Sequence, residues 1–274
     1  MPSNPLQQLL DLGQSVWLDE LRRDWLEDGR LRRFVEHDAI RGVTSNPSIF
    51  EKAIGGSRAY DEEVARLARA GLDSERIYDA LTVSDIRRAC DLFRPVYDAT
   101  DTWDGYVSHE VSPRLAYDGA ATVREAHRLW REVDRPNLMI KIPATTEGMP
   151  AVQACLEDGL NINVTLLFSL EQYEAVAEAY VAALEARTAA GEPIARTASV
   201  ASFFVSRVDT LVDRLLSARE EAANDEAGRA EARALRGAAA VANARRAYRR
   251  FQELFDGPRF QRLAARGGRP HAGI

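Results

Sequence analysis

Lysine is nearly absent from this sequence of 274 residues. Of its 36 lysine and arginine side chains, only Lys52 and Lys141 are lysine. Lys52 lies in the polar segment IFEKAIGG, which we expect to be a loop. Lys141 lies in the apolar run from Leu138 to Pro143, which predicts a buried strand. Because a buried ammonium is costly unless it is paired or loses its proton, the position of Lys141 needs a chemical or structural reason.

Other absences narrow the class of protein. The chain has two cysteines, Cys90 and Cys155, in helical patterns, which argues against a disulfide framework and predicts reduced thiols. No apolar run approaches the length of a membrane span, and the N-terminus lacks the charge and apolar pattern of a signal peptide. The net charge of -6 argues against a nucleic-acid binder, which needs a basic face. We therefore expect a cytoplasmic protein with neither a membrane nor a nucleic-acid partner.

The sequence also lacks the motifs of metal and nucleotide chemistry. Its histidines are scattered, without the HExxH or CxxC spacing of a metal site, at His37, His109, His127 and His271. Neither GxGxxG nor GxxxxGK[ST] occurs. We therefore expect no metal site and no cofactor.

Strand-like and helix-like segments alternate along the chain. Predicted strands cover 14–19, 41–50 with a break at Asn46-Pro47, 106–112, 138–143, 161–168 and 196–207. Helical patterns cover the charged stretch to about 34, then 58–70, 74–97, 121–133, 147–158, 169–189 and 208–254. Ser169 and Gln172 form a capping-box signature at the start of 169–189. This order predicts a parallel sheet covered by helices, and no linker divides the single expected domain, residues 1–274.

One face of the predicted strands is polar. In a parallel barrel, alternate residues of each strand point inward, and chemistry gathers at the C-terminal strand ends. Counting in twos gives an inward set of Trp17, Asp19, Thr44, Asn46, Ser108, Glu110, Met139, Lys141, Asn163, Thr165, Ser202 and Phe204. Six strands thus bring polar residues around one lysine, which solvation alone does not explain.

Lys141 has two interpretations. A desolvated lysine can attack a ketose carbonyl and form an imine, which arginine cannot do. The structural alternative is a lysine that reaches from a strand end to water. If the imine forms, carboxylates must take a proton from a sugar hydroxyl and handle the water that is lost. Asp19 and Glu110 have the required parity, and Thr165 can position a water beside Glu110.

Three further side chains fit a sugar phosphate. Asn46 and Asn163 can hydrogen-bond substrate hydroxyls, and Arg207, just past the sixth strand, can hold a phosphate with two hydrogen bonds. Each candidate also has a structural alternative: a helix N-cap for Asp19, a turn for Asn46, and a first-turn helix charge for Arg207.

Five motifs in order, GVTSNPSIF, SHEVSPRLAYD, MIKIPATTEG, NINVTLLFSLEQY and SVASFFVSRVD, resemble those of transaldolases. The likeness is to the longer bacterial type and runs from about Gln14 beyond the sixth strand. It implies an α/β fold, a (β/α)8 TIM barrel of the class I aldolase type. It also implies a pentose phosphate pathway enzyme that moves a dihydroxyacetone unit from sedoheptulose 7-phosphate to glyceraldehyde 3-phosphate through a lysine Schiff base.

The resemblance assigns roles to individual residues. Lys141 matches the Schiff-base lysine, and Asp19 matches the acid/base of carbon–carbon cleavage. Glu110 and Thr165 match the carboxylate and threonine that handle the catalytic water. The residues expected to bind substrate are Thr44, Asn46, Asn163, Ser202, Phe204 and, for the phosphate, Arg207. His109 departs from the expected aliphatic residue, and its outward parity predicts a packing effect at most.

The resemblance is incomplete at the C-terminus. A barrel of this family has eight strands, whereas this chain ends at ARGGRPHAGI, about where the seventh would begin. We expect a C-terminally incomplete barrel of about six strands, completed by a second polypeptide or a dimer if at all. Uncovered strand edges predict low stability and weak binding of phosphorylated sugar. The alternatives are an inactive truncated fragment, kept as a binding or scaffold piece, and a sugar-phosphate aldolase that uses the same lysine.

Overall fold

The computed structural model describes residues 4–270. These divide into two compact units, Met1–Lys141 and Ile142–Ile274, and each is described by itself. His271 and the other residues of the predicted tail, 271–274, lie outside the described residues, as do residues 1–3 at the N-terminus. One domain over 1–274 stays a prediction.

Four parallel strands form the sheet of the first unit. They are β1 (Val16–Leu18), β2 (Ile40–Thr44), β3 (Val107–Glu110) and β4 (Leu138–Pro143), and they pair in sequence order. The last two residues of β4 belong to the second unit. The four predicted strands and their parallel pairing are therefore confirmed. β4 has the predicted bounds, β1 and β3 are shorter at both ends, and β2 begins one residue earlier than predicted and ends at Thr44.

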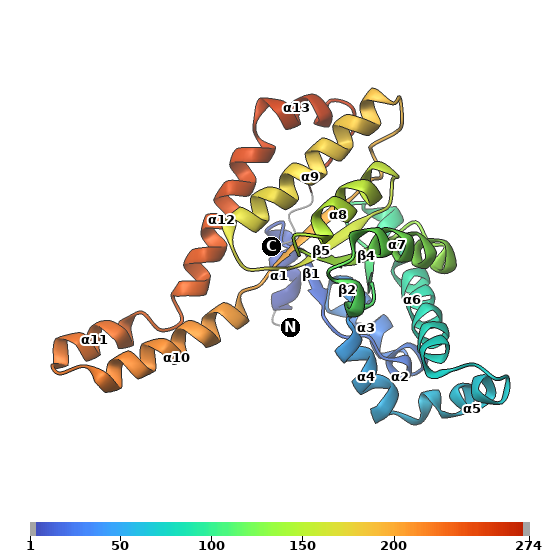
Figure 1. Ribbon diagram of the computed structural model, residues 1–274, viewed down its shortest axis with the longest axis horizontal. Coiled ribbons are helices and arrows are strands. Elements are labelled where there is room, and N and C mark those ends of the chain that lie inside the picture. The colour runs from blue at the N-terminus through green and yellow to red at the C-terminus, as the bar shows by residue number, and fades with distance from the viewer. Residues whose placement is uncertain (1–3, 271–274) are drawn as a thin grey trace. The chain divides into compact units, whose positions relative to one another are not determined.

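In this unit one helix precedes β1, and helices follow β1, β2 and β3 (Figure 1). Their bounds are α1 (Pro5–Asp11), α2 (Arg23–Glu27), α3 (Arg30–His37), α4 (Pro47–Gly56), η1 (Arg58–Tyr60), α5 (Asp61–Arg69), α6 (Ser74–Ala99), η2 (Pro113–Leu115) and α7 (Gly119–Val133). The charged stretch after β1 is two helices rather than one, because Gly29 adopts a left-handed conformation, with φ 76°, between α2 and α3.

The loop predicted around Lys52 is wrong, because that residue lies in α4. Asn46 accepts a hydrogen bond on its side chain from the N–H of Ile49 at 3.0 Å, and Pro47 occupies the first helical position. An N-cap followed by proline starts a helix directly. The dipeptide that ends β2 therefore also begins α4, which buries Phe50 and leaves Lys52 exposed.

The second unit contains two parallel strands, β5 (Ile162–Leu167) and β6 (Ser199–Phe203). Its helices are α8 (Gly148–Glu157), α9 (Leu170–Ala189), α10 (Ser206–Ala222), α11 (Glu226–Ala234), α12 (Ala239–Phe255) and α13 (Pro258–Ala264). The predicted capping box is present: Ser169 accepts from the Gln172 N–H at 3.2 Å, and Gln172 accepts from the Ser169 N–H at 3.3 Å.

The helical structure predicted over 208–254 is confirmed, but two breaks divide this stretch into three helices. Asp225 caps α11 by accepting from the Gly228 N–H at 2.7 Å. The turn before α12 contains Gly237, whose N–H donates to Asp213 of α10 at 2.9 Å. Figure 1 shows α10 and α11 as a helical hairpin. Side-chain capping by an aspartate thus overrode a continuous helical periodicity.

Both faces of the strands are buried. Val43, Val107, Ile140 and Val164 have no exposed surface, and neither do Ser108, Met139 and Asn163 of the predicted inward set. Cys90 and Cys155 are free thiols, as predicted, and both are buried. Among residues 4–270, no helix is both long and apolar enough to cross a membrane.

Candidate active site

Lys141 is buried at the C-terminal end of β4. It is 6% exposed, and its Nζ atom lies 3.4 Å from Oε2 of Glu110. The two residues are register partners on neighbouring strands, so their side chains share one face of the sheet. The alternative of a lysine that reaches water is contradicted by this burial. The amine is instead held beside a carboxylate in a largely desolvated setting, where an imine-forming lysine would be placed.

Ser45 completes the surroundings of the amine. Lys141 Nζ donates to its backbone carbonyl at 3.3 Å, and the Ser45 hydroxyl donates to the carbonyl of Ser108 at 2.8 Å. Ser45 has no exposed surface. The sequence does not reveal this role of Ser45, because its parity is opposite to that of Thr44 and because the contact to the lysine uses a backbone oxygen, which every residue type has.

Asp19 and Thr44 meet at the ends of β1 and β2. The Thr44 hydroxyl donates to Oδ1 of Asp19 at 2.5 Å, and Asp19 is exposed. The structural alternative, Asp19 as a helix N-cap, is wrong, because α2 begins four residues later and its cap position is Arg22. The carboxylate is therefore held by one neighbour and is open to a substrate hydroxyl.

Asn46 has a structural role, but as the N-cap of α4 rather than as the turn residue of the structural alternative. Its Oδ1 caps α4, and the residue is half-buried. An amide has two donors on nitrogen besides the oxygen. The Nδ2 group of Asn46 can therefore donate a hydrogen bond to a substrate oxygen.

In the second unit, Asn163 and Ser202 are brought together. The Ser202 hydroxyl donates to Oδ1 of Asn163 at 2.8 Å, so that the asparagine amide nitrogen is oriented by a neighbouring strand. Asn163 has no exposed surface and Thr165 is 2% exposed, both on β5. The sequence predicted all three residues on one face, and this hydrogen bond confirms it for the pair.

Phe204 and Arg207 lie where β6 leads into α10. The guanidinium carbon of Arg207 is 4.8 Å from the centroid of the Phe204 ring, which in turn is 5.3 Å from the ring of Phe168. Arg207 is exposed, in the first turn of α10 as the structural alternative predicted. A stacked guanidinium keeps its donors in the plane of the group, which suits an anion such as phosphate.

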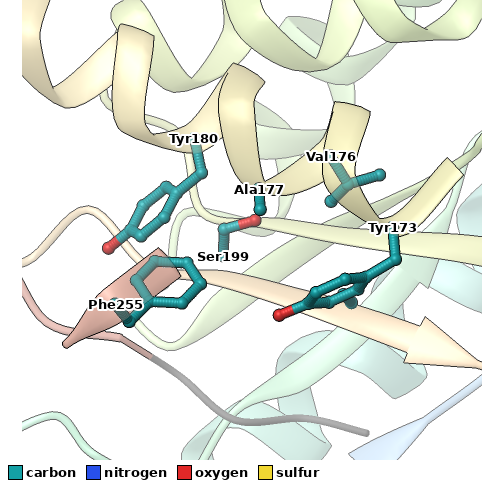
Figure 2. A pocket seen from close by; sticks show the side chains of 7 residues that line it. Tyr173, Val176, Ala177, Tyr180, Ser199 and Phe255 are labelled. Carbon is teal, nitrogen blue, oxygen red and sulfur yellow. The ribbon is translucent and has the colours of Figure 1, made fainter. Parts of the chain in front are cut away.

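An apolar pocket of the second unit lies on the face of β6 that is opposite to the Ser202 side chain (Figure 2). Side chains of α9, β6 and α12 line it: Tyr173, Val176, Ala177, Tyr180, Ser199, Ala201 and Phe255. Ser199 and Ala201 have the parity that faces the helices, whereas Ser202 has the other. The pocket is a gap in the packing of helices on the sheet and contains none of the predicted site residues.

His109 is buried behind the sheet, as its parity predicted. Its ring centroid lies 6.3 Å from that of Phe50 in an edge contact. Burial, together with the charge of Arg128, lowers the pKa of His109 to about 4. Within residues 4–270 its buried Nδ1 has no hydrogen-bond partner. The neutral imidazole therefore packs as an apolar group, at the expense of an unsatisfied ring nitrogen.

Known proteins resemble this chain over most of its length. The sequence profile of the family described as Transaldolase/Fructose-6-phosphate aldolase matches residues 16–264. A protein named transaldolase from Parafrankia sp. is 49% identical over 268 residues, which cover 98% of this chain and 70% of the relative. Transaldolases of Thiobacillus denitrificans and Thermobifida fusca are each 51% identical, over 94% and 97% of this chain and 70% of each relative.

Proposed function

Because the chain belongs to the transaldolase/fructose-6-phosphate aldolase family, we propose that it is a transaldolase that uses Lys141 as its Schiff-base amine. It moves a dihydroxyacetone unit from sedoheptulose 7-phosphate to glyceraldehyde 3-phosphate and yields erythrose 4-phosphate and fructose 6-phosphate. The observation that carries the proposal is the buried amine of Lys141 beside the Glu110 carboxylate, at 3.4 Å. The (β/α)8 barrel class of the family agrees with the parallel strands and intervening helices of each unit.

The first chemical step forms the imine. The neutral amine of Lys141 attacks the C2 carbonyl of the ketose, and the resulting carbinolamine loses its hydroxyl as water. Glu110 is close enough to accept a proton from the ammonium and to return it to the departing hydroxyl, which are general base and general acid roles. Thr165 receives its part in handling this water from the family resemblance.

The second step breaks the C3–C4 bond. Asp19 takes the proton of the C4 hydroxyl, whose oxygen becomes the carbonyl of the released aldose, and the C3–C4 electron pair moves toward the imine to give an enamine. The enamine carbon then attacks the aldehyde of the acceptor, and Asp19 returns the proton to the new hydroxyl. The exposed position of Asp19, held by Thr44, supports this role.

Substrate recognition falls to hydrogen-bonding and stacking groups. The family resemblance assigns contacts with the sugar to Thr44, Asn46, Asn163 and Ser202. It also assigns contact with the substrate to Phe204 and the phosphate to Arg207, whose guanidinium lies over the Phe204 ring.

The arginine-rich helices support a protein that does not bind nucleic acid. Arg229 and Arg233 both pair with Glu226, and Arg250 pairs with Glu174. Paired guanidinium groups do not form the free basic face that phosphate backbones require. We place the reaction in the cytoplasm, with phosphorylated sugars as its ligands.

Turnover assays test the proposal and its alternative. With fructose 6-phosphate and erythrose 4-phosphate, we expect release of glyceraldehyde 3-phosphate that depends on the acceptor and is lost in Lys141→Arg. The family description also names fructose-6-phosphate aldolase, so a simple aldolase is the second candidate. Repeated turnover without an acceptor would favour that aldolase, and equal activity of the parent and Lys141→Arg would contradict both.

A further inference from the structure

The chain on both sides of Asp19 is tied to buried carboxylates. Before it, Ser15 and Trp17 donate to the two oxygens of Asp104 at 2.5 and 3.3 Å, and Asp104 is 9% exposed. After it, Arg23 enters the interior, with 5% exposure. Asp19 itself is exposed, and the Thr44 hydroxyl donates to its carboxylate. The position of its carboxylate therefore depends on how firmly the flanking backbone is held.

Arg23 is held by an ion-pair network. Its Nε donates to Oδ1 of Asp85 at 2.8 Å, and its Nη1 donates to Glu63. Asp85 has no exposed surface. The guanidinium also lies over the ring of Tyr60, with its carbon 4.5 Å from the centroid. The side chain of Arg23 is thus fixed by groups from η1, α5 and α6.

Tyr60 also fixes the backbone at this point. Its hydroxyl donates to Oδ2 of Asp85 at 2.9 Å and accepts the backbone N–H of Arg23 at 3.1 Å. The cap position of α2, Arg22, makes no side-chain cap. The tyrosine hydroxyl therefore satisfies a helix-end donor that the local sequence leaves open. One hydroxyl links the start of α2 to the buried carboxylate of α6.

A contribution to stability does not account for such a network. The cost of desolvating a buried ion pair largely cancels its attraction, so that such a pair is weak evidence for stability. What the network does fix is geometry, because two carboxylates and one ring restrict the guanidinium of Arg23 to one orientation. Three residues separate Arg23 from Asp19, and one of them, Leu21, has no exposed surface. A displacement at Arg23 must therefore reach Asp19.

We propose that Tyr60 and Asp85 are positioning residues for Asp19 in the carbon–carbon cleavage step, acting through Arg23. The inference rests on the proposed function, since it presumes that Asp19 takes the substrate proton. Formation of the imine at Lys141 does not require Asp19 and leaves a six-carbon adduct with fructose 6-phosphate. Cleavage converts that adduct to a three-carbon one. The ratio of the two adducts therefore reports the placement of Asp19 separately from the integrity of the lysine site.

The test uses Tyr60→Phe, which keeps the ring under Arg23 and removes only the hydroxyl. The parent and variant are incubated with fructose 6-phosphate, reduced with sodium borohydride at timed intervals and measured by intact mass. Since a misplacement of about 1 Å can cost about a hundredfold in rate, we expect cleavage to slow by about ten- to a hundredfold. The six-carbon adduct should then accumulate at an unchanged total yield, as in Asp19→Asn.

Tyr180→Phe is the matched control. It removes a buried tyrosine hydroxyl of the second unit that hydrogen-bonds the carbonyls of Thr197 and Arg269 at 3.1 and 2.7 Å. We expect Tyr180→Phe to show the same ratio of six-carbon to three-carbon adduct as the parent. If Tyr60→Phe does not fold, Glu63→Gln replaces it, because Glu63 is a partly exposed acceptor of Arg23 and its loss should shift the ratio by a smaller factor.

The outcomes separate this inference from the proposed function. The positioning role would be overturned if the parent forms the three-carbon adduct and folded Tyr60→Phe shows the same ratio of six-carbon to three-carbon adduct as the parent. An equal loss of both adducts would also overturn it, since that is the result of general destabilisation. No adduct on the folded parent would overturn the proposed function, and the positioning role with it.

Discussion

The amine of Lys141 and the carboxylate of Glu110 lie 3.4 Å apart, with side-chain exposures of 7% and 14%. Each charge offsets part of the cost of burying the other, and the carboxylate is close enough to move a proton to or from the amine. Loss of this pair should therefore affect both the stability of this part of the sheet and the formation of the imine. A substitution of Glu110 tests both effects.

Glu110→Gln should affect both properties. Removing one partner of a buried pair leaves an uncompensated charge, for which we expect a loss of about 3 kcal/mol in the free energy of unfolding. Loss of a general acid/base should slow imine formation by about a hundredfold or more. Urea unfolding measures the first effect, and timed borohydride trapping measures the second. An adduct that forms at the parent rate would remove Glu110 from the mechanism.

Asp19→Asn should separate binding from cleavage. Because Asp19 is exposed, we expect the free energy of unfolding to change by no more than about 0.5 kcal/mol. Turnover should fall by about a hundred- to ten-thousandfold, since the group that takes the C4 proton is gone. Coupled turnover assays and thermal unfolding provide the two measurements. Normal turnover would show that another base performs this step.

Ser45→Ala tests the support beneath the lysine. The variant loses the hydrogen bond to the Ser108 carbonyl, at a cost of about 1 kcal/mol in the free energy of unfolding. Ser217→Ala is the matched control, because the Ser217 hydroxyl donates to the carbonyl of Asp213 at the same 2.8 Å. Both variants should be destabilised, but only Ser45→Ala should slow imine formation. Equal trapping rates would limit Ser45 to a structural role.

His109 should make the fold sensitive to acid. Its pKa is about 4 in the folded state against an ordinary value near 6.5, so below pH 6.5 the unfolded chain binds a proton that the folded chain does not. Stability from this residue is therefore present above pH 6.5 and is lost as the pH falls toward 4. Between pH 7 and pH 5 the loss is about 2 kcal/mol.

Unfolding at several pH values measures this effect. His109→Leu removes the titrating group and restores an apolar residue beside Phe50, so its stability should fall less than that of the parent over the same range. Other carboxylates titrate in both proteins, which makes the difference between the two curves the informative quantity. Parallel curves would mean that the imidazole is solvated in the folded chain.

The sequence predicted structural features correctly where a local pattern of residue types has one common structural or chemical explanation. A lysine in an apolar strand, Ser169 three residues before Gln172, and alternation along the strands each predicted a local feature that is present. Two-residue periodicity placed Asn163 and Ser202 on one face before any contact was known. These signals depend only on local backbone geometry, which is why they could be read without the fold.

Features that depend on contacts distant in sequence could not be predicted. Ser45 acts through its backbone carbonyl, and Tyr60 takes a capping role 37 residues away from the helix start that it serves. Arg23 is buried by partners on two other helices, although its sequence neighbours indicate an exposed charged segment. Helix breaks were missed where an aspartate side chain, as at Asp225, competes with the helical pattern.

The measurement that tests the central claim most directly locates the reduced adduct on the chain. Because the sequence has only two lysines, Lys52→Arg is an internal control for Lys141→Arg. After fructose 6-phosphate and borohydride, intact mass and peptide mapping should show a three-carbon adduct on Lys141 in the parent and in Lys52→Arg, and none in Lys141→Arg. An adduct on Lys52 or on the N-terminal amine, persisting in Lys141→Arg, would contradict the assignment of the Schiff base to Lys141.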